Sequence, residues 1–177
     1  MAGRNRHLKG DINPIIAPVH SYHTVEAGDF MVLSAVNRMI EDEISADNYA
    51  APFSAVKPDA THPVATLTNF LWTYFLGVAM EDSPAGVTEN ITIATTGVFR
   101  YPIHPIVAPG AVTIGSKVSA VSSTLTGNGV SAQTVIHGTD AARMCTAYLG
   151  YIVKTESGAS FVDFALRTAY GPGGLAS

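Results

Sequence analysis

Apolar residues in the second half of the chain recur with a period of two, and this feature constrains the fold more than any other. In the clearest stretch, Ile91 and Ile93 alternate with Thr92 and Ala94. Successive side chains of a β-strand point to opposite faces, so this spacing is typical of a strand with one buried face. Gly97 interrupts the alternation and predicts a bulge or a close approach of two backbones. We therefore expect a fold built mainly of β-strands.

Several further strands are expected from the same pattern. They cover residues 30–36, 131–137, 146–154 and 160–168. Asn128-Gly129 has the composition of a hairpin turn between two of them. Many short strands separated by turns indicate a barrel or a sandwich. We predict one mainly β domain over residues 21–170, with a β-barrel or β-tulip-like fold.

One segment has a helical pattern instead. Residues 66–75 carry apolar side chains at positions i, i+3, i+4, i+7 and i+8, namely Leu67, Phe70, Leu71, Tyr74 and Phe75. Thr66 is suited to the N-cap, and Gly77 to the position at which such a helix ends. The pattern predicts one helix, at about 66–75, inserted in the β domain.

The two ends of the chain are predicted to differ from this domain. Residues 1–20 read as an extended N-terminal arm, because Pro14 and Pro18 favour extended backbone in the residues before them. Three isoleucines in the arm imply that it lies against a partner. The residues expected to make that contact are Arg4, Arg6, Lys9, Ile12, Ile15, Ile16 and Val19. Residues 171–177, with three glycines and a proline, are expected to form a loose tail.

Composition favours a protein that is partly covered by others. Charged residues make up 14% of the chain, against a usual value of about 25%. The net charge of −4 gives no general basic field for holding nucleic acid. The sequence shows no signal-peptide pattern and no apolar run of about 20 residues, the length needed to span a membrane. We expect neither nucleic acid nor a membrane as a partner, and a cytoplasm-like compartment.

A metal site is the first candidate for chemistry. His20, His23 and Glu26 are spaced by three residues, which would place them on one face of a helix as zinc ligands. Pro18 and Val25 favour extended backbone instead, in which residues three apart point to opposite faces. The acidic run Glu41–Glu43 is read as a solvated loop rather than a calcium site. We therefore expect no metal and no cofactor.

A nucleophile is the second candidate. Cys145 is the only cysteine and lies in an apolar stretch, which favours a buried structural thiol. Pairing of Cys145 with His137 as nucleophile and base has no support in the sequence. His62 and His104 each precede a proline in irregular segments. We expect no catalytic site.

Five segments resemble, in their order, parts of small virion proteins of tailed bacteriophages. They are Phe75–Ala79, Ile91–Pro102, Pro109–Gly115, Leu149–Val153 and Phe161–Leu166. A Leu-Gly-Val-Ala strand that follows a helix comes first, then a strand with a glycine before an aromatic residue, then a Pro-Gly turn. This arrangement is similar to capsid cement (head decoration) proteins of the β-barrel or β-tulip type.

The resemblance implies a structural virion protein and not an enzyme. Such a protein binds the major capsid protein on the outside of the assembled shell, as a homotrimer, and stabilises contacts between capsomers. It is assembled in the host cytoplasm, and an N-terminal arm often spreads onto the shell. Two alternatives remain: another oligomeric virion component, such as a tail or head-fibre base protein, and a small β-barrel ligand-binding protein or enzyme with histidines lining a pocket.

Overall fold

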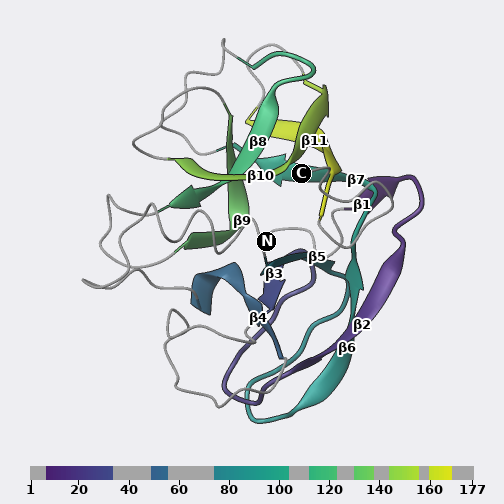
Figure 1. Ribbon diagram of the computed structural model, residues 1–177, viewed down its shortest axis with the longest axis vertical. Coiled ribbons are helices and arrows are strands. Elements are labelled where there is room, and N and C mark those ends of the chain that lie inside the picture. Colours follow the sequence, from purple (N-terminus) through teal and green to yellow (C-terminus); the bar gives the residue numbers. More distant parts are fainter. Residues whose placement is uncertain are drawn as a thin grey trace.

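The computed structural model describes residues 7–33, 49–55, 74–103, 112–122, 130–137, 144–155 and 160–168. Strands and turns make up almost all of this part of the chain, so the predicted β class is confirmed. The strands form a closed five-stranded barrel and a six-stranded sheet. In Figure 1 the sheet lies above the barrel.

The barrel is built from five short strands. They are β2 (Pro14–Val19), β4 (Ala50–Pro52), β3 (Phe30–Leu33), β5 (Phe75–Ala79) and β6 (Glu89–Ala94), in that order around the barrel. A short 3-10 helix, η1 (Phe53–Ala55), follows β4. β2 pairs antiparallel with β6 and touches β4 in parallel through one residue pair, which closes the barrel. Ile91 and Ile93 point into its interior, as their alternation predicts.

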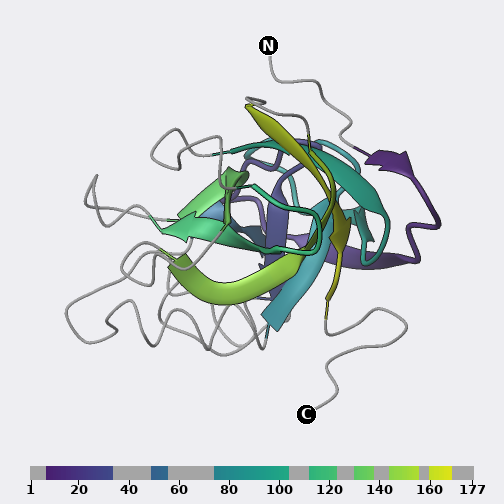
Figure 2. The ribbon, with the colours of Figure 1, turned by 90° about the horizontal axis from the view of Figure 1, so that it is seen from above.

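The six-stranded sheet is antiparallel throughout. Its strands are β1 (His7–Lys9), β7 (Val98–Pro102), β11 (Phe161–Leu166), β10 (Met144–Lys154), β8 (Lys117–Ser122) and β9 (Val130–His137), in spatial order. A bridge between Ile103 and Val135 brings β9 back to the end of β7. The sheet is therefore strongly curved, as Figure 2 shows from above.

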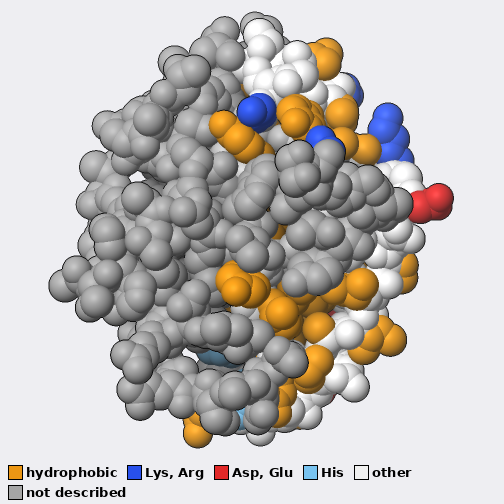
Figure 3. Space-filling model, in the orientation of Figure 1, with side chains coloured by type: hydrophobic (Ala, Val, Ile, Leu, Met, Phe, Trp, Pro, Cys, Tyr) orange, Lys and Arg blue, Asp and Glu red, His pale blue; other side chains and the backbone are white. Residues whose placement is uncertain are grey.

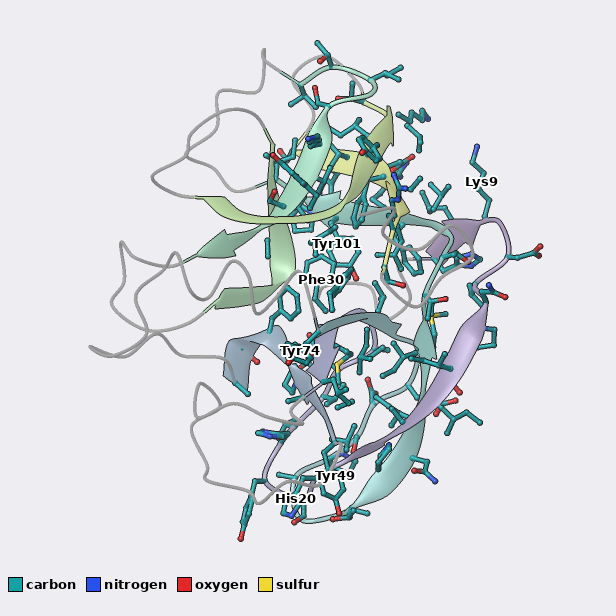
Figure 4. The ribbon with its side chains drawn as sticks, viewed as in Figure 1. Lys9, His20, Phe30, Tyr49, Tyr74 and Tyr101 are labelled. Atoms are coloured by element: carbon teal, nitrogen blue, oxygen red, sulfur yellow. The ribbon has the colours of Figure 1, made fainter. Side chains whose placement is uncertain are left out.

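Barrel and sheet share one hydrophobic core. Met31 points into the barrel, whereas its neighbours Phe30 and Val32 point into a larger cluster between barrel and sheet. The Phe30 ring stacks on Tyr101 of β7, with 4.6 Å between the ring centroids. The Tyr101 hydroxyl also donates a hydrogen bond to the carbonyl oxygen of Gly28, just before β3. Figure 4 shows Phe30 and Tyr101 between the two halves.

The inserted helix predicted at 66–75 is not supported. Phe75 begins β5, and residues 66–73 lie outside the described part of the chain. All five residues of β5 are buried, and a short, wholly apolar run gives no periodicity that separates a strand from a helix. Gly77, expected to end the helix, lies inside β5 with a φ of 146°. A Cβ on Gly77 would lie 2.0 Å from the carbonyl oxygen of Ala94, so the pairing with β6 requires glycine.

The extended N-terminal arm is not supported either. β1 belongs to the sheet and β2 to the barrel, so residues 7–19 are part of the body. The link between them is held by Thr95 and Thr96, whose backbone amides donate to the carbonyl of Ile12 at 2.9 and 3.1 Å. Asn13, before Pro14, has a φ of 44° instead of extended backbone. Prolines are tolerated in β2 because, among the described strands, only β4 pairs with its second edge, and only at Val19. Residues 1–6 and 171–177 lie outside the described residues.

Candidate interaction surface

One face of the six-stranded sheet packs on the core and the other faces outward. Tyr151 lies opposite Lys117 on β8 and opposite Ala165 on β11. Directly opposed residues of antiparallel strands point to the same side, so the set can be followed across the sheet. We call this set the outer sheet face: Lys9, Val98, Arg100, Pro102, Lys117, Tyr151, Lys154, Phe161, Asp163 and Ala165.

The outer sheet face exposes large apolar side chains. Phe161 is 51% exposed and Tyr151 is 37% exposed. Ile114 is 69% exposed and lies in a turn whose next two residues are hydrogen-bonded to the backbone of Ile152, the neighbour of Tyr151 on β10. Exposed aromatic and aliphatic side chains on one face of a sheet are a feature of protein interfaces.

Cationic side chains stand among these apolar groups. The Arg100 guanidinium binds the Asp163 carboxylate through two bonds, Nε to Oδ1 at 2.7 Å and Nη2 to Oδ2 at 3.0 Å. Asp163 is buried, while the Arg100 side chain is 48% exposed. The Lys117 ammonium lies 4.0 Å from the centre of the Tyr148 ring, within range of a cation–π interaction. Figure 3 shows lysine and arginine side chains gathered over the sheet.

The outside of the barrel has the opposite charge. Ile16, 74% exposed, lies opposite Thr92 of β6. The backbone amide and hydroxyl of Thr92 donate to the Glu81 carboxylate at 3.2 and 2.8 Å. The backbone amide of Ala27 donates to Asp82 at 2.8 Å. We call this surface the barrel patch: Ile16, Glu26, Glu81, Asp82 and Thr92.

The residues predicted to contact a partner do not share one surface. Lys9 is exposed on the sheet, and Ile16 is exposed on the barrel. Ile12 and Ile15 are half-buried, and Val19 is fully buried inside the barrel, where no partner reaches it. Arg4 and Arg6 lie outside the described residues. Capsid binding by this set stays a prediction.

The candidates for chemistry are not brought together. His23 is buried, whereas His20 stacks on Tyr22 and meets Tyr49 edge-on, with centroids 4.5 and 5.1 Å apart. Figure 4 shows His20 and Tyr49 at the end of the barrel remote from the sheet. Among the described residues, no three His, Cys, Asp or Glu side chains are grouped to hold a metal ion.

The other candidates fall in parts that are not described. Residues 41–43, His62 and His104 lie outside the described ranges, and the side chains of His137 and Cys145 are not described. In the described segments, no helix is long and apolar enough to cross a membrane.

Sequence reasoning missed the outer sheet face, although a signal for it existed. In the strand predicted at 160–168, Val162, Phe164 and Leu166 alternate as core residues. That parity places Phe161 on the opposite side of the strand. A large aromatic residue on the solvent side of a strand is the signal that identifies such a face.

No family model, curated protein or solved structure matches the chain. What the protein binds is therefore inferred from its own surface.

Proposed function

We propose that this protein is a structural component of a phage head, which binds the outside of the assembled capsid and stabilises contacts between capsomers. It acts as a homotrimer with the major capsid protein as its partner, on the virion surface. It has no catalytic role. The resemblance of five of its segments to capsid cement proteins supports this proposal.

The observation that carries the proposal is the presence of two separate contact surfaces on one small β body. The outer sheet face combines exposed apolar residues with fixed charges, and the barrel patch combines the exposed Ile16 with fixed charges. A protein that joins subunits needs at least two such surfaces, and needs them in fixed positions, so that little conformational entropy is lost on binding.

Static contact is sufficient for the proposed role. A ligand that binds only the assembled arrangement stabilises it by RT ln(1 + [L]/Kd). A trimer that contacts several capsomers at once also gains from high effective concentration, so that modest contacts in each chain suffice.

Fractionation of particles from cells that produce the chain tests the proposal. Heads and tails are separated on a density gradient, and the chain and the major capsid protein are quantified by mass spectrometry. We expect the chain in the head fractions at a fixed ratio to the capsid protein. Heads that lack it should also break at a lower temperature.

Two outcomes contradict the proposal. Recovery of the chain in tail fractions would make it another virion component. Recovery as free protein, with a bound small molecule or a measurable turnover, would favour a ligand-binding protein or an enzyme.

A further inference from the structure

Positive charge is concentrated on the sheet. All the described lysines and arginines lie on its strands or directly after β11: Lys9, Arg100, Lys117, Lys154 and Arg167. The only acid on the described sheet strands is Asp163, which is bound to Arg100. The exposed Asp11, in the link after β1, is a second acid on this half, so five basic residues against two acids give its described residues a formal charge of +3.

Negative charge is concentrated on the barrel. Its described strands and connections, residues 14–33, 49–55 and 74–94, contain no lysine or arginine. They contain five acids, Glu26, Asp29, Glu81, Asp82 and Glu89, and so a formal charge of −5. Only Asp29 of these is buried. The separation is one of the described residues, and the net charge of −4 for the whole chain does not reveal it.

Each charged surface has an exposed apolar centre. On the sheet, Phe161 and Tyr151 stand among the cations, and on the barrel, Ile16 adjoins the hydrogen-bonded pair Thr92 and Glu81. The Glu81 and Asp82 carboxylates are held by backbone and hydroxyl donors, so they are positioned before any partner arrives. The two surfaces are therefore complementary in charge, and each exposes apolar side chains that a partner could cover.

We propose that copies of this chain bind one another head to tail, with the outer sheet face of one copy on the barrel patch of the next. Contact between two outer sheet faces, or between two barrel patches, brings charges of the same sign together. This repulsion disfavours a two-fold symmetric dimer through either surface. Contact between unlike surfaces pairs lysines with carboxylates around the apolar centres. A stable interface needs about 800 Å² from each partner, roughly a tenth of the 8858 Å² surface of this chain.

Head-to-tail contacts form a closed ring when the rotation between copies closes, and a filament when it does not. A ring of three copies would be the homotrimer of the proposed function, and the choice of three copies rests on that function. The contact itself is measured on the purified chain, without capsids.

Paired charge reversals test the contact. The sheet variant carries Lys9→Glu and Lys117→Glu, and the barrel variant carries Glu26→Lys and Glu81→Lys. A third chain carries all four substitutions and so exchanges the charges of the two surfaces. Mass is measured by light scattering after size exclusion, with thermal melts to confirm that each variant is folded.

We expect the wild-type chain to form an oligomer at about 50 mM salt and to dissociate as salt rises to about 500 mM, because screening shortens the range of charge interactions. Each two-site variant should raise the dissociation constant by about a hundredfold or more, since like charges then face each other. The four-site chain should recover the wild-type mass, which general destabilisation does not predict.

Three results overturn the inference: a wild-type chain that stays monomeric at low salt, an oligomer that neither pair of reversals disturbs, or a folded four-site chain that stays monomeric. Binding of a labelled 20-base-pair DNA by a monomeric chain, abolished in the sheet variant, would assign the sheet to a nucleic acid instead. A monomer that still cosediments with heads refutes the head-to-tail contact and the homotrimer, but leaves the proposed binding to the capsid intact. An oligomer that does not bind heads supports the head-to-tail contact and refutes the proposed binding to the capsid.

Discussion

Substitution of Gly150 by alanine should destabilise the protein severely, because β10 and β11 leave no room for a side chain at this residue. A Cβ on Gly150 would lie 1.9 Å from the carbonyl oxygen of Ala165 and 3.0 Å from a ring carbon of Phe164. To restore even 3.0 Å to that oxygen, β11 must retreat by about 1.1 Å, which stretches the neighbouring ladder hydrogen bonds beyond bonding distance. Overpacking and the loss of one or two backbone bonds together cost about 2–4 kcal/mol.

Gly115→Ala is the matched control for this experiment. Gly115 lies beside the same strand, with its amide bonded to the carbonyl of Ile152, but a Cβ there meets no atom within 4 Å. Its φ of 85° makes alanine strained, at a cost of about 1–2 kcal/mol. Urea unfolding followed by far-UV circular dichroism measures both variants. If Gly150→Ala costs no more than Gly115→Ala, the close approach of the two strands is wrong.

Three further predictions concern the joints of the fold. Tyr101→Phe should lower the free energy of unfolding, measured by urea titration, by about 1–3 kcal/mol, because it leaves the buried Gly28 carbonyl without this donor. The control Tyr151→Phe, on the surface, should lower it by less than about 0.5 kcal/mol. A double-mutant cycle on Arg100 and Asp163 should give a coupling energy of about 1 kcal/mol, since the arginine is half in water, and a value near zero would contradict the paired geometry. Deletion of residues 1–6, which removes Arg4 and Arg6, should lower occupancy on heads. Deletion of residues 1–19 removes β1 and β2 and should prevent folding, so a folded 20–177 fragment would refute the place of β2 in the barrel.

Strands with one buried face were predictable from the sequence. Ile91 and Ile93 point into the barrel, and the strand predicted at 160–168 is present as Phe161–Leu166. In both cases the period of two reports directly which side chains leave water. The signal fails where both faces are buried, as in β5, because all positions are then apolar.

The prediction of an N-terminal arm was wrong for a different reason. Pro14 and Pro18 correctly indicated non-helical backbone, but a free arm and a strand paired on one edge have the same local preference. What decides between them is the pairing of Ile16 with Thr92 and the bonds from Thr95 and Thr96, which lie about eighty residues away in the chain. No local pattern carries that information.

The candidate surfaces could not be predicted for the same reason, because they depend on pairing between distant parts of the chain. Composition indicated a shortage of charge but not its distribution, because the cations that gather on the sheet come from strands far apart in sequence. Only the strand order β1-β7-β11-β10-β8 brings Lys9 and Lys117 to one face.

The shared core fixes the orientation of the outer sheet face relative to the barrel patch. β3 contributes Met31 to the barrel interior and Phe30 to the cluster that also holds Tyr101 and Phe164 of the sheet. Because one four-residue strand packs into both clusters, rotation of the sheet against the barrel would open a close-packed interior. The angle between the outer sheet face and the barrel patch is therefore set by the core. In a head-to-tail assembly that angle determines how many copies close a ring, so core substitutions at Phe30 should change the size of the assembly before they abolish the contact itself.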